Sequence, residues 1–117
     1  MINQAAARQW AEDTFGMMCM DKHERAMRFL EEAFEAAQAA GVTDKDAVCL
    51  WRVVYDKPVG ELAQEIGGAL LTLALLSEGA GLDMEWAGDT EFLRARTMPR
   101  DYIKARHAVK VAAGVAR

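Results

Sequence analysis

The fold of this chain is decided by the stretch Glu61-Leu-Ala-Gln-Glu-Ile-Gly-Gly-Ala-Leu-Leu-Thr-Leu-Ala-Leu-Leu-Ser-Glu78. At about 100° per residue, its apolar side chains cover nearly the whole circumference of a helix. A helix that is apolar on all sides is typical of a buried, central position. One narrow polar strip interrupts it, formed by Glu61, Glu65, Gly68 and Thr72. We therefore expect a buried helix from about 61 to 78 at the centre of the fold.

Start and stop signals on both sides of this stretch predict further helices. Asp21 and Thr43 are good N-cap residues, and each is followed three positions later by an acidic residue, Glu24 or Asp46, as in a capping box. The expected helices cover about 3–15, 21–40, 44–55, 83–96 and 100–112. The prediction is an all-α fold with four to five helices in a bundle around the helix at 61–78, completed by oligomerisation.

Composition limits the class of protein. With 117 residues and a mass of 12.9 kDa, we expect one domain over residues 1–117. The first fifteen residues are too polar for a signal peptide, and the longest apolar run, Ala69–Leu76, is too short to cross a bilayer. Two cysteines form no disulfide framework, and the net charge of -4 argues against nucleic-acid binding. These features predict a cytoplasmic protein without membrane or nucleic-acid partners.

The charge is unevenly distributed along the chain. Residues 1–88 hold 7 Lys/Arg against 15 Asp/Glu, whereas residues 89–117 hold 7 against 3. A basic C-terminal tail, about 94–117, therefore follows an acidic body. The tail either closes over an anionic ligand held in the acidic body by a cation, or is a solvated helix end.

Two sets of glutamates are candidates for a metal site. The helix expected at 21–40 carries Glu31, Glu32 and Glu35 at spacings that bring carboxylates to one face. Mg²⁺ prefers such hard oxygen ligands, and it would relieve the repulsion between them. A second set, Glu61 and Glu65, belongs to the helix that we expect to be buried. A solvated acidic face remains the alternative interpretation of the first set.

Two runs together resemble the MazG-type all-α nucleoside triphosphate pyrophosphohydrolases: Arg28-Phe-Leu-Glu-Glu-Ala-Phe-Glu-Ala-Ala-Gln38 and Glu61-Leu-Ala-Gln-Glu-Ile-Gly-Gly-Ala-Leu-Leu-Thr-Leu-Ala74. The family pattern is EExxE on one helix and ExxD on a later one, and the resemblance covers roughly residues 8–95. It implies Mg²⁺-dependent hydrolysis of nucleoside triphosphates to the monophosphate and pyrophosphate, with Mn²⁺ as a possible substitute. It also implies a homodimer or a dimer of dimers.

The resemblance assigns roles by position. Glu32, Glu35 and Glu65 match metal ligands, and Glu31 is the leading acid of the first motif. Gly68 stands where the family has the Asp of ExxD, so one ligand of the pattern is missing.

The mechanism that the resemblance implies assigns two further roles. Glu31 or Glu61 would orient or deprotonate the attacking water, as the catalytic carboxylates. Three basic residues would neutralise the triphosphate, namely Arg94, Arg96 and Lys104. Two alternatives stay open: a catalytically weakened relative that binds nucleotide or metal, and a non-enzymatic helical interaction module.

Overall fold

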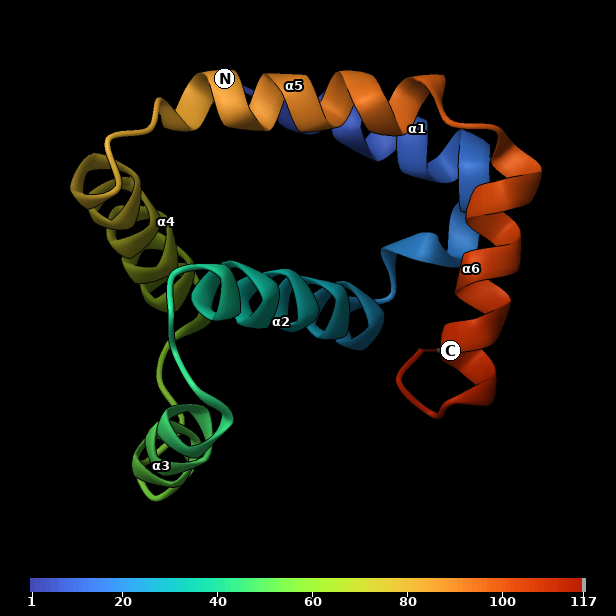
Figure 1. Cartoon of the computed structure of the whole chain (residues 1–117). Coiled ribbons are helices and arrows are strands. Elements are labelled where there is room, and N and C mark those ends of the chain that lie inside the picture. The colour runs from blue at the N-terminus through green and yellow to red at the C-terminus, as the bar shows by residue number, and fades with distance from the viewer. Residues whose placement is uncertain (117) are drawn as a thin grey trace. The chain divides into compact units, whose positions relative to one another are not determined.

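The computed structural model describes residues 1–116 and consists of helices joined by short connections (Figure 1). The six α-helices are α1 (Gln4–Phe15), α2 (Lys22–Ala39), α3 (Asp44–Tyr55), α4 (Leu62–Gly79), α5 (Met84–Thr97) and α6 (Arg100–Ala112). A 3₁₀ turn, η1 (Met17–Met20), lies between α1 and α2. No strand occurs in the described part of the chain, so the all-α prediction is confirmed, and every expected helix forms within two residues of its expected ends.

Local caps explain why the sequence predicts these boundaries well. At the start of α3, the Thr43 hydroxyl accepts a hydrogen bond from the Asp46 amide at 3.2 Å. The Asp46 carboxylate accepts one from the Thr43 amide at the same distance, which completes the capping box. The Asp21 carboxylate likewise accepts from the Glu24 amide at 2.9 Å at the start of α2. Each cap satisfies amides that the first helical turn leaves without a partner.

We expect Thr43→Ala to lower the free energy of unfolding by about 1 kcal/mol, because the amide of Asp46 loses its partner. Urea unfolding followed by circular dichroism measures the change. The control is Thr72→Ala in α4, where the hydroxyl contacts carbonyls of its own helix and caps nothing. An equal loss in both variants would contradict the capping role of Thr43.

The chain divides into two compact units. The terminal unit comprises Met1–Leu30 together with the chain from Asp83 onward, and the central unit is Glu31–Leu82. The terminal unit thus contains α1, η1, the first half of α2, α5 and α6, whereas the central unit contains the rest of α2 with α3 and α4.

A small aromatic core holds the terminal unit together. The Trp10 ring meets the Phe15 ring edge-on at 6.0 Å and the Phe92 ring of α5 at 6.4 Å. Phe15 in turn lies 5.6 Å from the His107 ring of α6. Within the described residues, the buried apolar residues are Ala11 of α1 and Cys19 of η1, both in this unit. These contacts join α1 to α5 and α6, although α1 is far from both in sequence.

A buried ion pair lies at the start of α2. The side chain of Glu24 is 6% exposed and pairs with Arg28, one turn later, at 3.2 Å. The Arg28 guanidinium also donates a hydrogen bond to the Val115 carbonyl. This arginine therefore connects α2 with the C-terminal end of the chain within the terminal unit.

The expected burial of the helix at 61–78 is wrong for a single chain. No residue between 31 and 82 is buried. On one face of α4 the side chains of Leu62, Ile66 and Leu70 are 57%, 60% and 52% exposed. The apolar pattern is present as predicted, but the helices of the central unit make too few contacts with one another to cover it. A surface this apolar is typical of an interface that another molecule covers.

Candidate metal centre

Three carboxylates gather on α2 within the central unit. Oxygens from Glu31, Glu32 and Glu35, one from each residue, all lie within 4.8 Å of one another. Glu31 and Glu35 are one helical turn apart, so the period of the helix places them on the same face. Glu31 is half-buried, whereas Glu32 and Glu35 are exposed. The predicted first set of glutamates therefore does converge.

The donor set fits a hard divalent cation. Mg²⁺ takes oxygen ligands at about 2.0–2.1 Å, so oxygens on opposite sides of one ion lie about 4 Å apart. The three oxygens lie within 4.8 Å of one another, so rotations about the side-chain bonds would have to bring them closer together to share one ion. Carboxylates are also the ligand type that Mg²⁺ and Mn²⁺ accept in preference to nitrogen or sulfur.

Glu65, the fourth predicted ligand, is not part of this group of carboxylates. Its side chain turns back toward the start of α4, where its carboxylate lies against Gly60 so closely that a Cβ there would collide with it. Gly60 thus leaves the space that the Glu65 carboxylate occupies. In this arrangement the predicted second half of the site is separate from the first.

Glu61 is the N-cap of α4. One carboxylate oxygen accepts from the Ala63 amide at 3.1 Å, and the other accepts from the Gln64 amide at 2.8 Å. The bond from the Gln64 amide lowers the pKa of the Glu61 carboxyl most, and the bond from the Ala63 amide lowers it further. A carboxylate whose charge is already stabilised is a weaker base, so the geometry gives Glu61 a capping role and does not favour the predicted catalytic one.

The lowered pKa of Glu61 gives a pH-dependent prediction. Because the carboxyl of Glu61 has a lower pKa in the folded chain than the ordinary 4.5 of the unfolded chain, its ionisation stabilises the fold. This stabilisation is fully present above the unfolded pKa and is lost as the pH falls through the folded pKa. We therefore expect the melting temperature of Glu61→Gln to be lower than that of the parent at neutral pH, and the difference to disappear in acid. Thermal melting between pH 3 and 7 measures it.

The matched control is Glu78→Gln at the other end of α4, where the glutamate is exposed and caps no helix start. The difference in melting temperature between Glu78→Gln and the parent should not shrink in the same way as the pH falls. A gap between Glu61→Gln and the parent that stays constant across the acid range would contradict the assigned cause.

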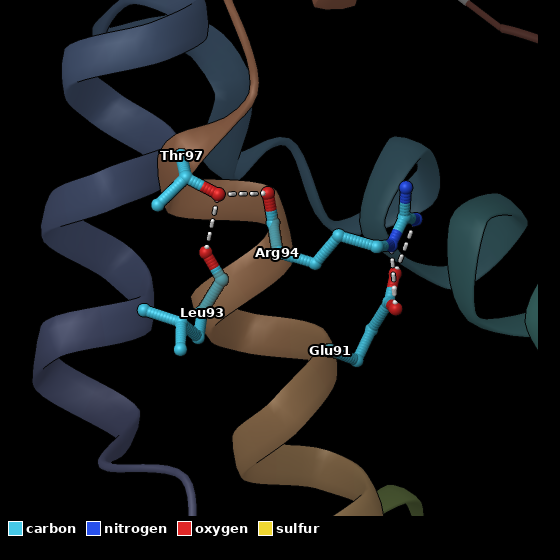
Figure 2. A network of polar contacts seen from close by, with 4 residues as sticks. All are labelled: Glu91, Leu93, Arg94 and Thr97. Carbon is cyan, nitrogen blue, oxygen red and sulfur yellow. Dashed lines mark hydrogen bonds and ion pairs between the residues drawn. The ribbon is translucent and has the colours of Figure 1, made fainter.

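The three predicted substrate-binding cations lie in the terminal unit. Arg94 is engaged by Glu91, one turn earlier on α5: Nε lies 2.9 Å from one carboxylate oxygen and Nη2 lies 2.6 Å from the other (Figure 2). The guanidinium of Arg96 stacks on the Phe92 ring at 4.1 Å. Lys104 is exposed on α6. The role of Glu91 was missed in the sequence, although its spacing of three residues from Arg94 is a recognised ion-pair signal.

The rest of the polar strip on α4 provides space and no ligand. A Cβ added at Gly68 would meet nothing within 4 Å, and the same holds for its neighbour Gly67. The Thr72 hydroxyl donates to the carbonyls of Gly68 and Ala69 at 3.0 Å each. The two glycines therefore mark open surface in the single chain, and Thr72 is occupied by its own helix.

Comparison with known proteins gives no match: no family model, curated protein or solved structure is similar to this chain. Within the described residues, no helix alone is both long and apolar enough to span a membrane; α4 and α5 reach that length and composition only when taken together.

Proposed function

We propose that this protein is a divalent-metal-dependent nucleoside triphosphate pyrophosphohydrolase of the MazG type. The observation that carries the proposal is the convergence of the carboxylates of Glu31, Glu32 and Glu35 on one face of α2. The EExxE spacing that produces this convergence is also the first half of the motif that resembles the family. Mg²⁺ is the proposed physiological ion, and Mn²⁺ is its experimental substitute.

In the proposed reaction, the exposed carboxylates of Glu32 and Glu35 would hold the ion. The ion would neutralise charge on the phosphate oxygens and favour ionisation of the attacking water. Glu31, half-buried beside them, accepts a hydrogen bond from the attacking water and orients it. The water oxygen would bond to the α-phosphorus while its proton passes to the Glu31 carboxylate, the bond from that phosphorus to the bridging oxygen would break, and pyrophosphate would leave. Glu65 joins as a ligand if its side chain rotates away from Gly60.

Positive charge for the triphosphate is the proposed role of the basic C-terminal tail. Lys104 and Arg96 remain the candidates, because Lys104 is exposed and the partner of Arg96 is an aromatic ring. Arg94 would first have to leave the Glu91 carboxylate, which holds it through two bonds. We therefore give Arg94 the lesser part in substrate binding.

The proposal includes a homodimer or a dimer of dimers. Apolar side chains on several sides of α3 and α4 are exposed in the single chain, including Trp51 at 46% and Leu71 at 62%. Full burial of an exposed apolar side chain contributes about 1.5–3 kcal/mol, and side chains that are already half covered would contribute roughly half of that. Both thiols, Cys19 and Cys49, are free, which suits the reducing cytoplasm that we propose as the compartment.

Two experiments together test the proposed function. The first measures pyrophosphate release from a panel of ribo- and deoxyribonucleoside triphosphates with Mg²⁺ or Mn²⁺. The second follows thermal melting as either ion is added, because an ion that binds only the folded chain raises the melting temperature. Ion-dependent stabilisation together with pyrophosphate release supports the enzyme.

The other outcomes favour the alternatives. If the ion stabilises the chain but no nucleotide releases pyrophosphate, the result favours a catalytically weakened relative. The presence of Gly68 in place of the motif's Asp supports this alternative. If millimolar ion does not raise the melting temperature, the result favours a helical interaction module. The exposed apolar faces of α3 and α4 support this alternative.

Once Glu65 turns from Gly60 to the ion, as proposed above, Gly68→Asp should strengthen the site. Position 68 is three residues after Glu65 on the same helical face, and open space surrounds it. We expect metal affinity to rise by about tenfold, through one added carboxylate ligand, and pyrophosphate release to rise with it. The control is Gly67→Asp, which adds the same charge in equally open space but about 100° around the helix. Equal effects of the two substitutions would contradict a ligand position at 68.

A further inference from the structure

A groove in the terminal unit is separate from the carboxylate cluster. Its volume is about 770 Å³, within the range of about 300–1,000 Å³ that is typical of small-molecule sites. Side chains of α1, α5, η1 and the start of α2 line it, together with Ile2 from the N-terminal segment. All of these lie in the terminal unit, so the groove is formed within one compact part of the chain.

The walls of the groove are largely apolar. Trp10 and Phe92 contribute aromatic surface from α1 and α5, with their rings edge to face at 6.4 Å. Met20 adds a flexible thioether side chain. Small residues of α1, among them Ala7 and Ala11, leave the space open. A ligand that fills this groove must therefore have an apolar body.

The groove also contains one cation without a counter-charge. Arg8 is paired with Glu12 at 2.8 Å, and Glu91 is paired with Arg94, so these charged lining residues are already compensated. Arg25 differs: its Nε atom is buried and has no hydrogen-bond partner among the described residues. No carboxylate of residues 1–116 pairs with the Arg25 guanidinium, so an anion in the groove would compensate its charge.

We propose that this groove binds an amphiphilic monocarboxylate, a straight-chain fatty acid of medium length. The carboxylate would accept hydrogen bonds from the two Nη atoms of Arg25, which lines the groove, in the two-pronged geometry that suits a guanidinium. The aliphatic chain would lie against Trp10 and Phe92. The Arg25 guanidinium carries a single positive charge, which a monoanionic carboxylate balances better than a dianionic phosphate does. This site is independent of the proposed hydrolase site.

The first test compares decanoate with decanol on the full chain by titration calorimetry. The two probes share an alkyl chain and differ in the head group, so we expect decanoate to bind at least about tenfold more tightly through its charge-assisted hydrogen bonds. In ¹⁵N-resolved spectra, decanoate should shift the indole signal of Trp10. The indole signals of Trp51 and Trp86 should not move, because neither residue lines the groove.

The second test uses Arg25→Met, which keeps an apolar stem of similar length and removes the charge. Decanoate affinity should fall by about tenfold or more, whereas decanol affinity should stay unchanged. The matched control is Lys22→Met, one turn earlier on α2, which removes an exposed cation outside the groove lining and should leave both affinities unchanged.

Three results would overturn the proposal: equal affinity of the parent for decanoate and decanol, unchanged decanoate affinity in Arg25→Met, or an indole shift at Trp51 or Trp86 instead of Trp10. The comparison of the two probes uses the parent chain, so it decides the question even if Arg25→Met does not fold.

Discussion

Glu35→Gln is expected to abolish the rise in melting temperature that Mg²⁺ or Mn²⁺ produces in the parent, and pyrophosphate release with it. The amide keeps the shape of the side chain but removes the charge that a hard dication needs from the cluster of Glu31, Glu32 and Glu35. An ion at a hundred times its dissociation constant stabilises a fold by about 2.7 kcal/mol, which is roughly 10 °C for a chain of this size. The variant should show none of this shift.

The control for Glu35→Gln is Glu78→Gln, an exposed glutamate of the same unit that lies outside the cluster. It should keep the full ion-dependent shift. Melting curves with and without ion, beside an assay of released pyrophosphate, measure both variants. If Glu35→Gln binds Mn²⁺ as the parent does, the carboxylates of α2 are not the ligands and the cluster is a solvated acidic face.

The second large effect is expected at the apolar face of α4. Ile66→Glu should convert the dimer or larger assembly to a monomer, or unfold the central unit at low concentration. Ile66 lies between Leu62 and Leu70 on one face of the helix, and all three side chains are more than half exposed in the single chain. If a second copy covers this face, a charge at its centre loses its hydration without gaining a partner.

Gln64→Glu is the matched control, since it adds the same charge one half-turn away, where the sequence is already polar. Sedimentation velocity across a range of concentrations measures the assembly state. We expect the association of Ile66→Glu to weaken by at least about a hundredfold, which corresponds to about 2.7 kcal/mol, and that of Gln64→Glu to stay within a few-fold of the parent. A monomeric parent would contradict the proposed homo-oligomer.

The sequence by itself determined the helices and the first half of the candidate site. Thr43 with Asp46 and Asp21 with Glu24 form their predicted caps, because a cap involves residues only three positions apart. The convergence of Glu31, Glu32 and Glu35 was predictable for the same reason, since it follows from the period of one helix. Interactions of this range depend little on how the rest of the chain folds.

Only the tertiary structure decided what covers each helix and where each longer side chain turns. The apolar pattern of α4 predicted burial, yet Leu62 and Ile66 are exposed, because a pattern shows that a face can be buried and not whether this chain supplies the cover. Glu65 turned back to Gly60 and Arg94 to Glu91, through choices of rotamer that the pattern leaves open. The groove at Arg25 joins segments distant in sequence, and such packing depends on all the helices together.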